Sequence, residues 1–222
     1  SQLKPNYLHL LNTYIKALEQ RNIYLKQIKF ENKNIEMLEI WDTKLAELSE
    51  KIYEYRKYYT QKIEEKIKII HNNITNCGID SEEIEIKYIS SGKTKEDYYN
   101  NLVKNRNIDI KRGFTSTGIH RDDLLIKINN RDVGIYGSQG QQRTSILSLK
   151  LTELNIINEE IGEKPILLLD DFMSELDEKR RKNFINTIND NQVFITCTDL
   201  IELENGKNQT YKIENGKKYT NT

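Results

Sequence analysis

The chain has 222 residues, and its 34 lysines and arginines balance 34 aspartates and glutamates, so the formal net charge is zero. This length suits one large or two small domains, and the neutral charge gives no bulk support for nucleic-acid binding, which would need a local basic patch. Two cysteines argue against a disulfide framework, and the absence of a signal peptide and of an apolar run of membrane length predicts a cytoplasmic protein without membrane contact.

Residues 1–76 predict an arm formed by a hairpin of two long helices. Apolar side chains recur three and four positions apart in two runs, which residues 31–34 interrupt. The second helix, from Leu38 to Ile74, would be about 60 Å long, and the short connection predicts antiparallel packing. The first stripe contains a polar residue that can set the register of the helix pair; the stripe is Leu8, Leu11, Ile15, Leu18, Asn22, Leu25 and Ile28.

Residues 77–113 predict a connection with one strand near residues 84–89 and a short helix near residues 98–103. Within it, Gly92-Lys93-Thr94 resembles the end of a phosphate loop. The full motif G-x-x-x-x-G-K-[ST] requires a glycine five positions before Gly92, where this chain has Lys87. We therefore expect a surface loop here.

The segment from residue 124 predicts a hairpin that turns at Asn129-Asn130 and returns through residues 133–136. A long amphipathic helix should follow Ser138 and end at Gly162. Ser138 is a good N-cap, and the exposed amides at such a helix start attract phosphate. An ordinary capped helix is the alternative.

Two carboxylates follow the apolar run of residues 166–169, which predicts a strand covered on both faces, as in a central parallel sheet. Open α/β sheets bind ligands at the carboxyl ends of their strands, where Asp170 and Asp171 lie. Asp170 suits Mg²⁺, which prefers oxygen ligands, and Asp171 could orient or deprotonate an attacking water. The alternative for this pair is an acidic loop that caps the next helix.

The remaining residues alternate helix and strand. A second capping sequence, residues 174–177, should open a helix through about Ile188, and a strand over residues 193–197 would carry Cys197 into the core. Residues 210–213 and 217–220 predict a closing hairpin. The alternation predicts an α/β lobe over residues 77–222.

Four segments together are highly specific in order and spacing: residues 118–124, Gly-Ile-His-Arg-Asp-Asp-Leu; residues 136–144, Tyr-Gly-Ser-Gln-Gly-Gln-Gln-Arg-Thr; residues 166–177; and residues 193–198. They resemble the C-terminal part of RecF, a family of bacterial recombination mediator ATPases, and the resemblance covers nearly the whole chain. It implies an α/β fold: the C-terminal lobe of an ABC-type head, related to SMC ATPases, with a parallel-strand core, flanking β-hairpins and an antiparallel, coiled-coil-like helical arm. In this family the phosphate loop lies upstream of the arm, so we expect an N-terminal lobe to precede this chain.

The resemblance also implies that two ATP molecules lie between two subunits, each held by the phosphate loop of one and the signature of the other. The signature residues that would contact the partner's ATP are Ser138, Gln139, Gly140 and Gln141. Asp170 would be the Mg²⁺ ligand, and Asp171 the catalytic residue. Ser174 and Asp177 would belong to a loop that touches the partner subunit. Thr198 occupies the position of a switch histidine. Thr198 can donate a hydrogen bond but cannot titrate as a histidine does. Asp171 is shorter than the Glu that many relatives have at this position, and its shorter reach fits a protein that uses ATP as a slow switch.

Three further residues are candidates for contacts with nucleotide phosphate or the DNA backbone: His120, Arg121 and Arg143. Arginine suits bidentate phosphate binding. An ion pair with Asp122 or Asp123 is the alternative for the first two.

The resemblance implies a DNA-binding protein of recombination, repair, replication and the SOS response. It would bind gapped or double-stranded DNA, form a homodimer on ATP binding, and act with recombination mediator proteins to load recombinase. Without the phosphate-loop lobe we expect weak ATP binding and negligible turnover. Two alternatives stay open. The first is another SMC-like head, which the short arm disfavours. The second is a module that docks a protein partner through tyrosines, which are enriched at interfaces; these are Tyr53, Tyr55, Tyr58 and Tyr59. The basic residues of the arm, Arg21, Arg56, Lys57 and Lys62, either line a DNA path or form a solvated face.

Overall fold

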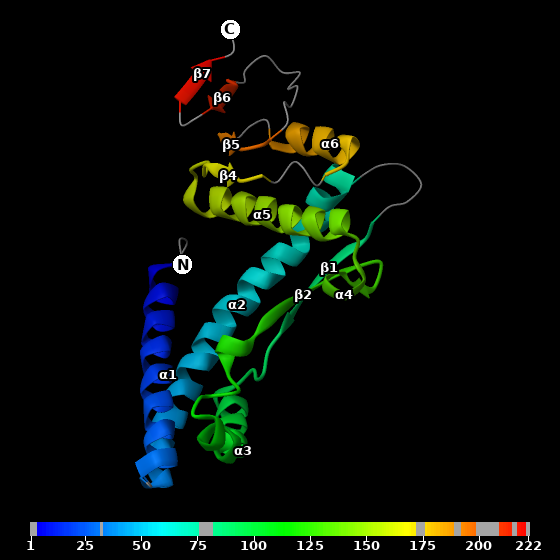
Figure 1. Cartoon of the computed structure of the whole chain (residues 1–222). Helices are drawn as coiled ribbons and strands as arrows, with labels where there is room; N and C mark the ends of the chain where they lie inside the picture. The colour runs from blue at the N-terminus through cyan, green and yellow to red at the C-terminus, as the bar shows by residue number, and fades with distance from the viewer. Residues whose placement is uncertain are drawn as a thin grey trace.

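A computed structural model describes residues 4–31, 33–75, 82–171, 176–188, 192–198, 209–214 and 217–220 (Figure 1). Its first half contains two long helices, α1 (Pro5–Glu31) and α2 (Leu38–Thr75), with the single turn η1 (Ile35–Met37) between them. The helices run antiparallel, as predicted (Figure 1). The 38 residues of α2 correspond to a length of about 57 Å.

The buried face of α1 differs from the predicted stripe. Two of the predicted positions, Leu8 and Ile15, are 43% and 42% exposed. The residues that α1 buries are Tyr14, Ala17, Arg21, Leu25 and Ile28. The reason is that α1 packs against α3 (Lys95–Arg112) as well as α2, and its buried face is centred on a charged residue that apolar periodicity does not detect.

Arg21 joins the three helices from inside the fold. Its side chain has no exposure, and it pairs through Nε with Asp42 Oδ1 and through Nη1 with Asp109 Oδ2, both at 2.7 Å. The neighbouring Asn22 accepts hydrogen bonds from the backbone N–H and the hydroxyl of Thr115, each at 2.7 Å. These contacts fix α1 against α2, α3 and the segment that follows α3, and they exclude Arg21 from a solvated face or a DNA path.

An antiparallel sheet follows in the order β1 (Ile84–Ile89), β2 (Asp123–Ile128), β3 (Arg131–Asp132). The predicted tight turn is confirmed, since Asn129 and Asn130 have φ of 49° and 65°. The predicted return strand over residues 133–136 is wrong, because these residues form the helical turn α4 (Val133–Tyr136). The carboxylate of Asp132 caps this turn by accepting a hydrogen bond from the Gly134 N–H at 2.8 Å.

The other elements are α5 (Gln139–Ile161), β4 (Leu167–Leu169), α6 (Glu178–Ile188) and β5 (Val193–Ile195). As predicted, β4 and β5 are parallel, and β6 (Tyr211–Glu214) pairs with β7 (Lys217–Thr220) as a closing hairpin. In the described part of the chain, β4 is not covered on both faces. Leu169 packs with α5 and α6, but Leu168 and Phe194 on the opposite face are 72% and 56% exposed, because strand side chains alternate. Cys197 is also exposed rather than in the core.

Helix α2 contributes to four hydrophobic clusters, and its first residue, Leu38, packs with Leu25 and Ile28 of α1. Leu45 and Ile52 pack with α1 and α3, Ile63 and Ile67 with β1 and β2, and Ile70 and Ile74 with α5 and α6. Helix α2 is therefore continuous from the predicted arm to the elements that carry the site. The division into an arm of residues 1–76 and a lobe of residues 77–222 stays a prediction. Within the described ranges, no helix has the length and apolarity needed to cross a membrane.

Candidate functional site

The predicted signature lies at the first turn of α5. Ser138 is the N-cap: its hydroxyl accepts a hydrogen bond from the Gln141 N–H at 3.2 Å, and Gln141 Oε1 accepts one from the Ser138 N–H at 3.0 Å. This reciprocal capping box satisfies two amides and fixes the start of the helix. Ser138 and Gln139 are exposed, so the segment is accessible to a ligand.

Among the described residues, a Cβ at position 140 would meet only Arg180 Nη1, at 3.7 Å, which is an ordinary van der Waals distance. Gly140 lies in the first turn of α5, where a glycine lets another molecule approach the backbone closely. Arg143, one turn further along α5, is half-buried.

The two predicted carboxylates lie at the carboxyl end of β4 and are both exposed. Thr196, just after β5, connects them: its hydroxyl donates to Asp170 Oδ1 at 2.5 Å and accepts from the Asp171 N–H at 3.0 Å. Asp171 has a φ of 45°, a left-handed conformation that is uncommon outside glycine and concentrated at functional sites. Sequence reasoning missed Thr196, although its position after the strand next to β4 was a usable signal.

This carboxylate pair fits a magnesium–nucleotide site rather than a cage built by protein alone. Within the described ranges, no three His, Cys, Asp or Glu side chains gather as metal ligands. Mg²⁺ at nucleotide sites usually takes one or two carboxylates and completes its shell with phosphate oxygens and water. Asp170, held by Thr196, can supply such a ligand.

The start of α6 contains Asp177, whose Oδ1 accepts the Arg180 N–H at 2.9 Å and whose Oδ2 lies 3.2 Å from Arg180 Nε. Asp177 therefore caps α6, yet its side chain is 61% exposed and can still meet a partner. Ser174 lies outside the described residues. Thr198 is exposed after β5.

His120 lies in the turn η2 (Ile119–Arg121), and its ring faces the arm. Its Nδ1 is 2.7 Å from the Tyr14 hydroxyl, and burial lowers the pKa of His120, so the ring is neutral near pH 7. Gly118 is required beside it, because its φ is 128° and a Cβ would lie 2.9 Å from Tyr14 Oη. Arg121 is exposed, and Asp122 accepts hydrogen bonds from the hydroxyls of Tyr88 and Ser90. Within the described ranges Arg121 forms an ion pair with neither Asp122 nor Asp123, so that alternative is wrong for Arg121.

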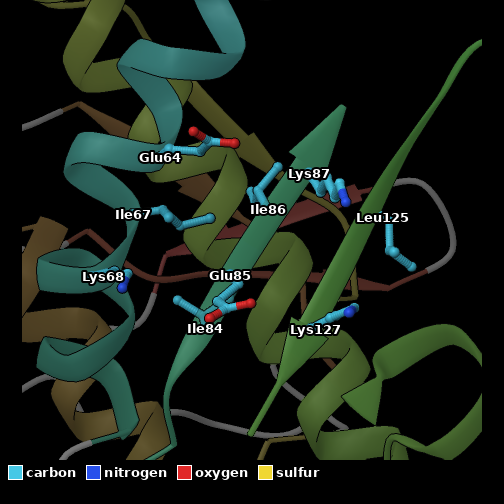
Figure 2. A pocket seen from close by; sticks show the side chains of 9 residues that line it. All are labelled: Glu64, Ile67, Lys68, Ile84, Glu85, Ile86, Lys87, Leu125 and Lys127. Carbon is cyan, nitrogen blue, oxygen red and sulfur yellow. The ribbon is translucent and has the colours of Figure 1, made fainter. Parts of the chain in front are cut away.

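Two hollows are lined by none of the predicted site residues, although Asp122 and Asp123, which follow Arg121, line the larger one. One, of about 350 Å³, is lined by side chains of α2, β1 and β2, among them Glu64, Lys68 and Lys127, and contains none of the predicted site residues (Figure 2). The other, of about 620 Å³, lies between the arm and α5 and includes Tyr55 and Tyr59. The four tyrosines of the docking alternative therefore do not form one surface. Tyr55 and Tyr59 line this hollow, Tyr53 is buried, and Tyr58 is 47% exposed.

A parallel strand pair that ends in two carboxylates, a capped helix with an exposed Ser-Gln-Gly start and a long helical hairpin together define the fold of an ABC-type ATPase lobe with an arm. No family model matches the chain. The DNA replication and repair protein RecF of Acetivibrio thermocellus is 43% identical in an alignment of 230 residues, gaps included, and the alignment covers 98% of this chain and 62% of that protein. RecF of Clostridium tetani is 43% identical over 227 residues, which cover 97% and 60%.

A solved structure of the recombination mediator protein RecF with ATP, from the RecFOR pathway, matches with a TM-score of 0.82 at 39% identity. The match covers 99% of this chain and 60% of that one. The chain belongs to the RecF family and spans about three fifths of the length of these relatives.

Proposed function

We propose that this chain is part of an ATP-gated DNA-binding protein of recombination and repair, which forms a homodimer around ATP. The observation that carries the proposal is the exposed, capped start of α5, where a Cβ at Gly140 would meet, among the described residues, only Arg180 Nη1 at 3.7 Å, so the backbone is open to a ligand. The relatives named as DNA replication and repair proteins, and a RecF solved with ATP, support it.

In this proposal, Ser138, Gln139, Gly140 and Gln141 contact the γ-phosphate of the ATP held by the partner subunit. The N-terminus of a helix is a favourable anion site, because its free amides and its dipole both present positive charge. Helix α5 has 23 residues, so its dipole is fully developed at Ser138. The phosphate loop, which these 222 residues lack, comes from another part of the full-length protein.

Asp170 holds Mg²⁺ together with phosphate oxygens, and Asp171 orients or deprotonates the attacking water. The bound Mg²⁺ supplies charge neutralisation at the phosphates. Thr196 holds Asp170 through Oδ1, and among the described residues no hydrogen bond is formed by the other carboxylate oxygen. The side chain of Asp171 is one methylene shorter than that of glutamate, which supports slow turnover and a switch-like use of ATP.

The proposed partners are gapped or double-stranded DNA, recombination mediator proteins and a second copy of this protein, in the cytoplasm. Ser174 and Asp177 belong to the loop that touches the second copy. Arg121 and Arg143 are the proposed contacts for phosphate or the DNA backbone. His120 is a neutral residue that holds η2 against Tyr14, so we assign it a supporting position beside Arg121.

The test is ATP-dependent dimerisation of the full-length protein, measured by sedimentation, with DNA binding measured in parallel. Ser138→Arg places a long cation where the partner's ATP should dock, and it should abolish both the dimer and the ATP-dependent part of DNA binding. Asn155→Arg introduces the same side chain at an exposed position of the same helix and should behave as wild type. An ATP-dependent dimer of Ser138→Arg with wild-type affinity would overturn the proposal.

A second candidate function is protein docking through the hollow between the arm and α5. Its lining includes Tyr55, Arg56 and Tyr59, and tyrosine and arginine are enriched at interfaces. If ATP and Ser138→Arg both leave DNA binding unchanged, the docking function is the better account of this chain.

A further inference from the structure

Glu82, two residues before β1, lies where three parts of the fold meet. Its Oε1 accepts hydrogen bonds from Arg180 Nη2 at 2.7 Å and from Gln141 Nε2 at 3.2 Å. Its Oε2 faces His71 Nε2 of α2 at 3.4 Å. The Glu82 side chain is only 11% exposed. A single carboxylate therefore contacts the signature turn of α5, the first turn of α6 and the long helix α2.

Arg180 extends this cluster, because each nitrogen of its guanidinium has a partner on a different segment. Nε lies 3.2 Å from Asp177 Oδ2, and Nη1 donates to Thr144 Oγ1 at 2.9 Å, while Nη2 reaches Glu82. Thr144 in turn donates to the carbonyl oxygen of Gly140 at 2.6 Å. Asp177 and the signature turn are thus connected through one side chain, that of Arg180.

His71 places the arm helix next to the same carboxylate: its Nε2 and Glu82 Oε2 are 3.4 Å apart, and neither atom has a hydrogen-bond partner among the described residues. The His71 side chain has no exposure, and Nδ1 lies 2.9 Å from the hydroxyl of Ser148 in α5. Ser148 donates to the carbonyl oxygen of Thr144 at 2.8 Å. Since α2 continues to the turn at η1, a displacement of the arm would be transmitted directly to the side chains that surround Glu82.

The cluster depends on the charge of Glu82. Burial by itself would raise the pKa of this carboxyl, but the contacts with His71, Arg180 and Gln141 lower it to about 2, so Glu82 is ionised near neutral pH. Charge-assisted hydrogen bonds are roughly twice as strong as neutral ones, and they weaken if the acceptor becomes neutral. Replacement by glutamine removes the charge and keeps the shape.

We infer that Glu82 is a positioning residue: it holds the ATP-contacting turn of α5 and, through Arg180, Asp177 at the start of α6 in one fixed arrangement and couples both to the arm helix α2. This inference rests on the proposed ATP-driven dimer and names the residue through which the arm and the dimer interface act on each other. Because both Gln141 and Asp177 would meet the partner subunit, losing their common anchor weakens the dimer even when every signature residue is present.

The experiment compares Glu82→Gln with Glu160→Gln in the full-length protein. Glu160 is a matched control, because it too joins α2 to α5: its Oε1 pairs with Lys62 Nζ at 2.6 Å, its side chain is 15% exposed, and it lies at the other end of α5. The readouts are the protein concentration that gives half-maximal dimer at saturating ATP, and the midpoint of thermal unfolding. A merely structural role predicts the same changes in both variants.

We expect Glu82→Gln to raise the half-maximal concentration about ten-fold, within the 5- to 150-fold range of typical coupling between sites. Glu160→Gln should leave it unchanged at a similar thermal midpoint. Arg180→Gln should raise it at least as much as Glu82→Gln, and the double variant should resemble Arg180→Gln, since the two side chains act through one contact.

The inference is overturned if Glu82→Gln dimerises like wild type, if Glu160→Gln shifts the concentration equally, or if the effects at Glu82 and Arg180 multiply. A wild-type protein that stays monomeric with ATP refutes the proposed function instead, so the two failures are distinguishable.

Discussion

Replacing Arg21 by methionine should destabilise the arm by an amount that follows from its contacts. Arg21 and its partners Asp42 and Asp109 have no exposed side-chain surface. Removing one partner of a buried ion pair costs about 3–5 kcal/mol, because the remaining charge stays buried. Here each carboxylate keeps another contact: Asp42 pairs with Arg106 at 2.6 Å, and Asp109 accepts from the Ser116 hydroxyl at 2.6 Å.

These remaining partners place the expected loss near the lower bound, at about 3 kcal/mol in the free energy of unfolding. The buried Nη2 of Arg21 has no hydrogen-bond partner in the described part of the chain, and removing it recovers part of the desolvation cost. For a unit of 150–250 residues, 1 kcal/mol shifts the thermal midpoint by about 2–4 °C, so about 3 kcal/mol predicts a shift of about 6–12 °C.

The assay is thermal and urea unfolding followed by circular dichroism, with Lys16→Met as the control. Lys16 is exposed on the same helix, and its replacement should change the free energy of unfolding by less than about 0.5 kcal/mol. A loss below about 1 kcal/mol for Arg21→Met, the average for any point mutation, would refute the argument that this ion cluster holds the three helices together.

Two further predictions test the carboxylate site at Asp170 and the contact between His120 and Tyr14 of the arm. Thr196→Val removes the hydroxyl that holds Asp170 and should lower Mg²⁺-dependent ATP turnover of the full-length protein by about ten-fold, the factor for 1.4 kcal/mol. Thr187→Val, which removes a hydroxyl bound only to the Asn183 carbonyl oxygen among the described residues, is the control; equal turnover in both contradicts the assignment. For His120, burial lowers the folded-state pKa below the usual 6.5, so the unfolded chain binds protons first as pH falls. Stability should therefore decrease as pH falls through 6.5 towards the folded-state pKa, and His120→Asn should flatten this slope in urea unfolding at pH 7 and pH 5; an unchanged slope contradicts it.

Features that depend on neighbouring residues were predictable from the sequence. The N-cap at Ser138, the helix end at Gly162 and the turn at Asn129-Asn130 have the expected conformations, because each is set by contacts within about four residues. The parallel pairing of β4 and β5 also agrees with the alternation of strand and helix. The return strand over residues 133–136 failed because the cap provided by Asp132 outweighed the apolar alternation.

Features that depend on distant partners were not predictable. Arg21 pairs with Asp109, which is 88 positions away, and Glu82 pairs with Arg180 across 98 positions. Each of these residues looks like a solvated surface charge in the sequence. The carboxylates of Asp170 and Asp171 were recognisable, and the predicted pairing of β4 with β5 could have pointed to Thr196, but the hydrogen bonds of its hydroxyl became visible only in the structure.

By itself, the amino-acid sequence determined the long helices, the caps and the tight turn at Asn129-Asn130, and the order and spacing of its motifs were sufficient to indicate the RecF family. The tertiary structure alone decided which face of α1 is buried, which charges lie inside the fold, and how Glu82 brings α2, α5 and α6 together. The physical reason is that periodicity records only whether a side chain is apolar. A charged side chain can be solvated or paired in the interior, and the choice depends on whether folding brings an opposite charge to it.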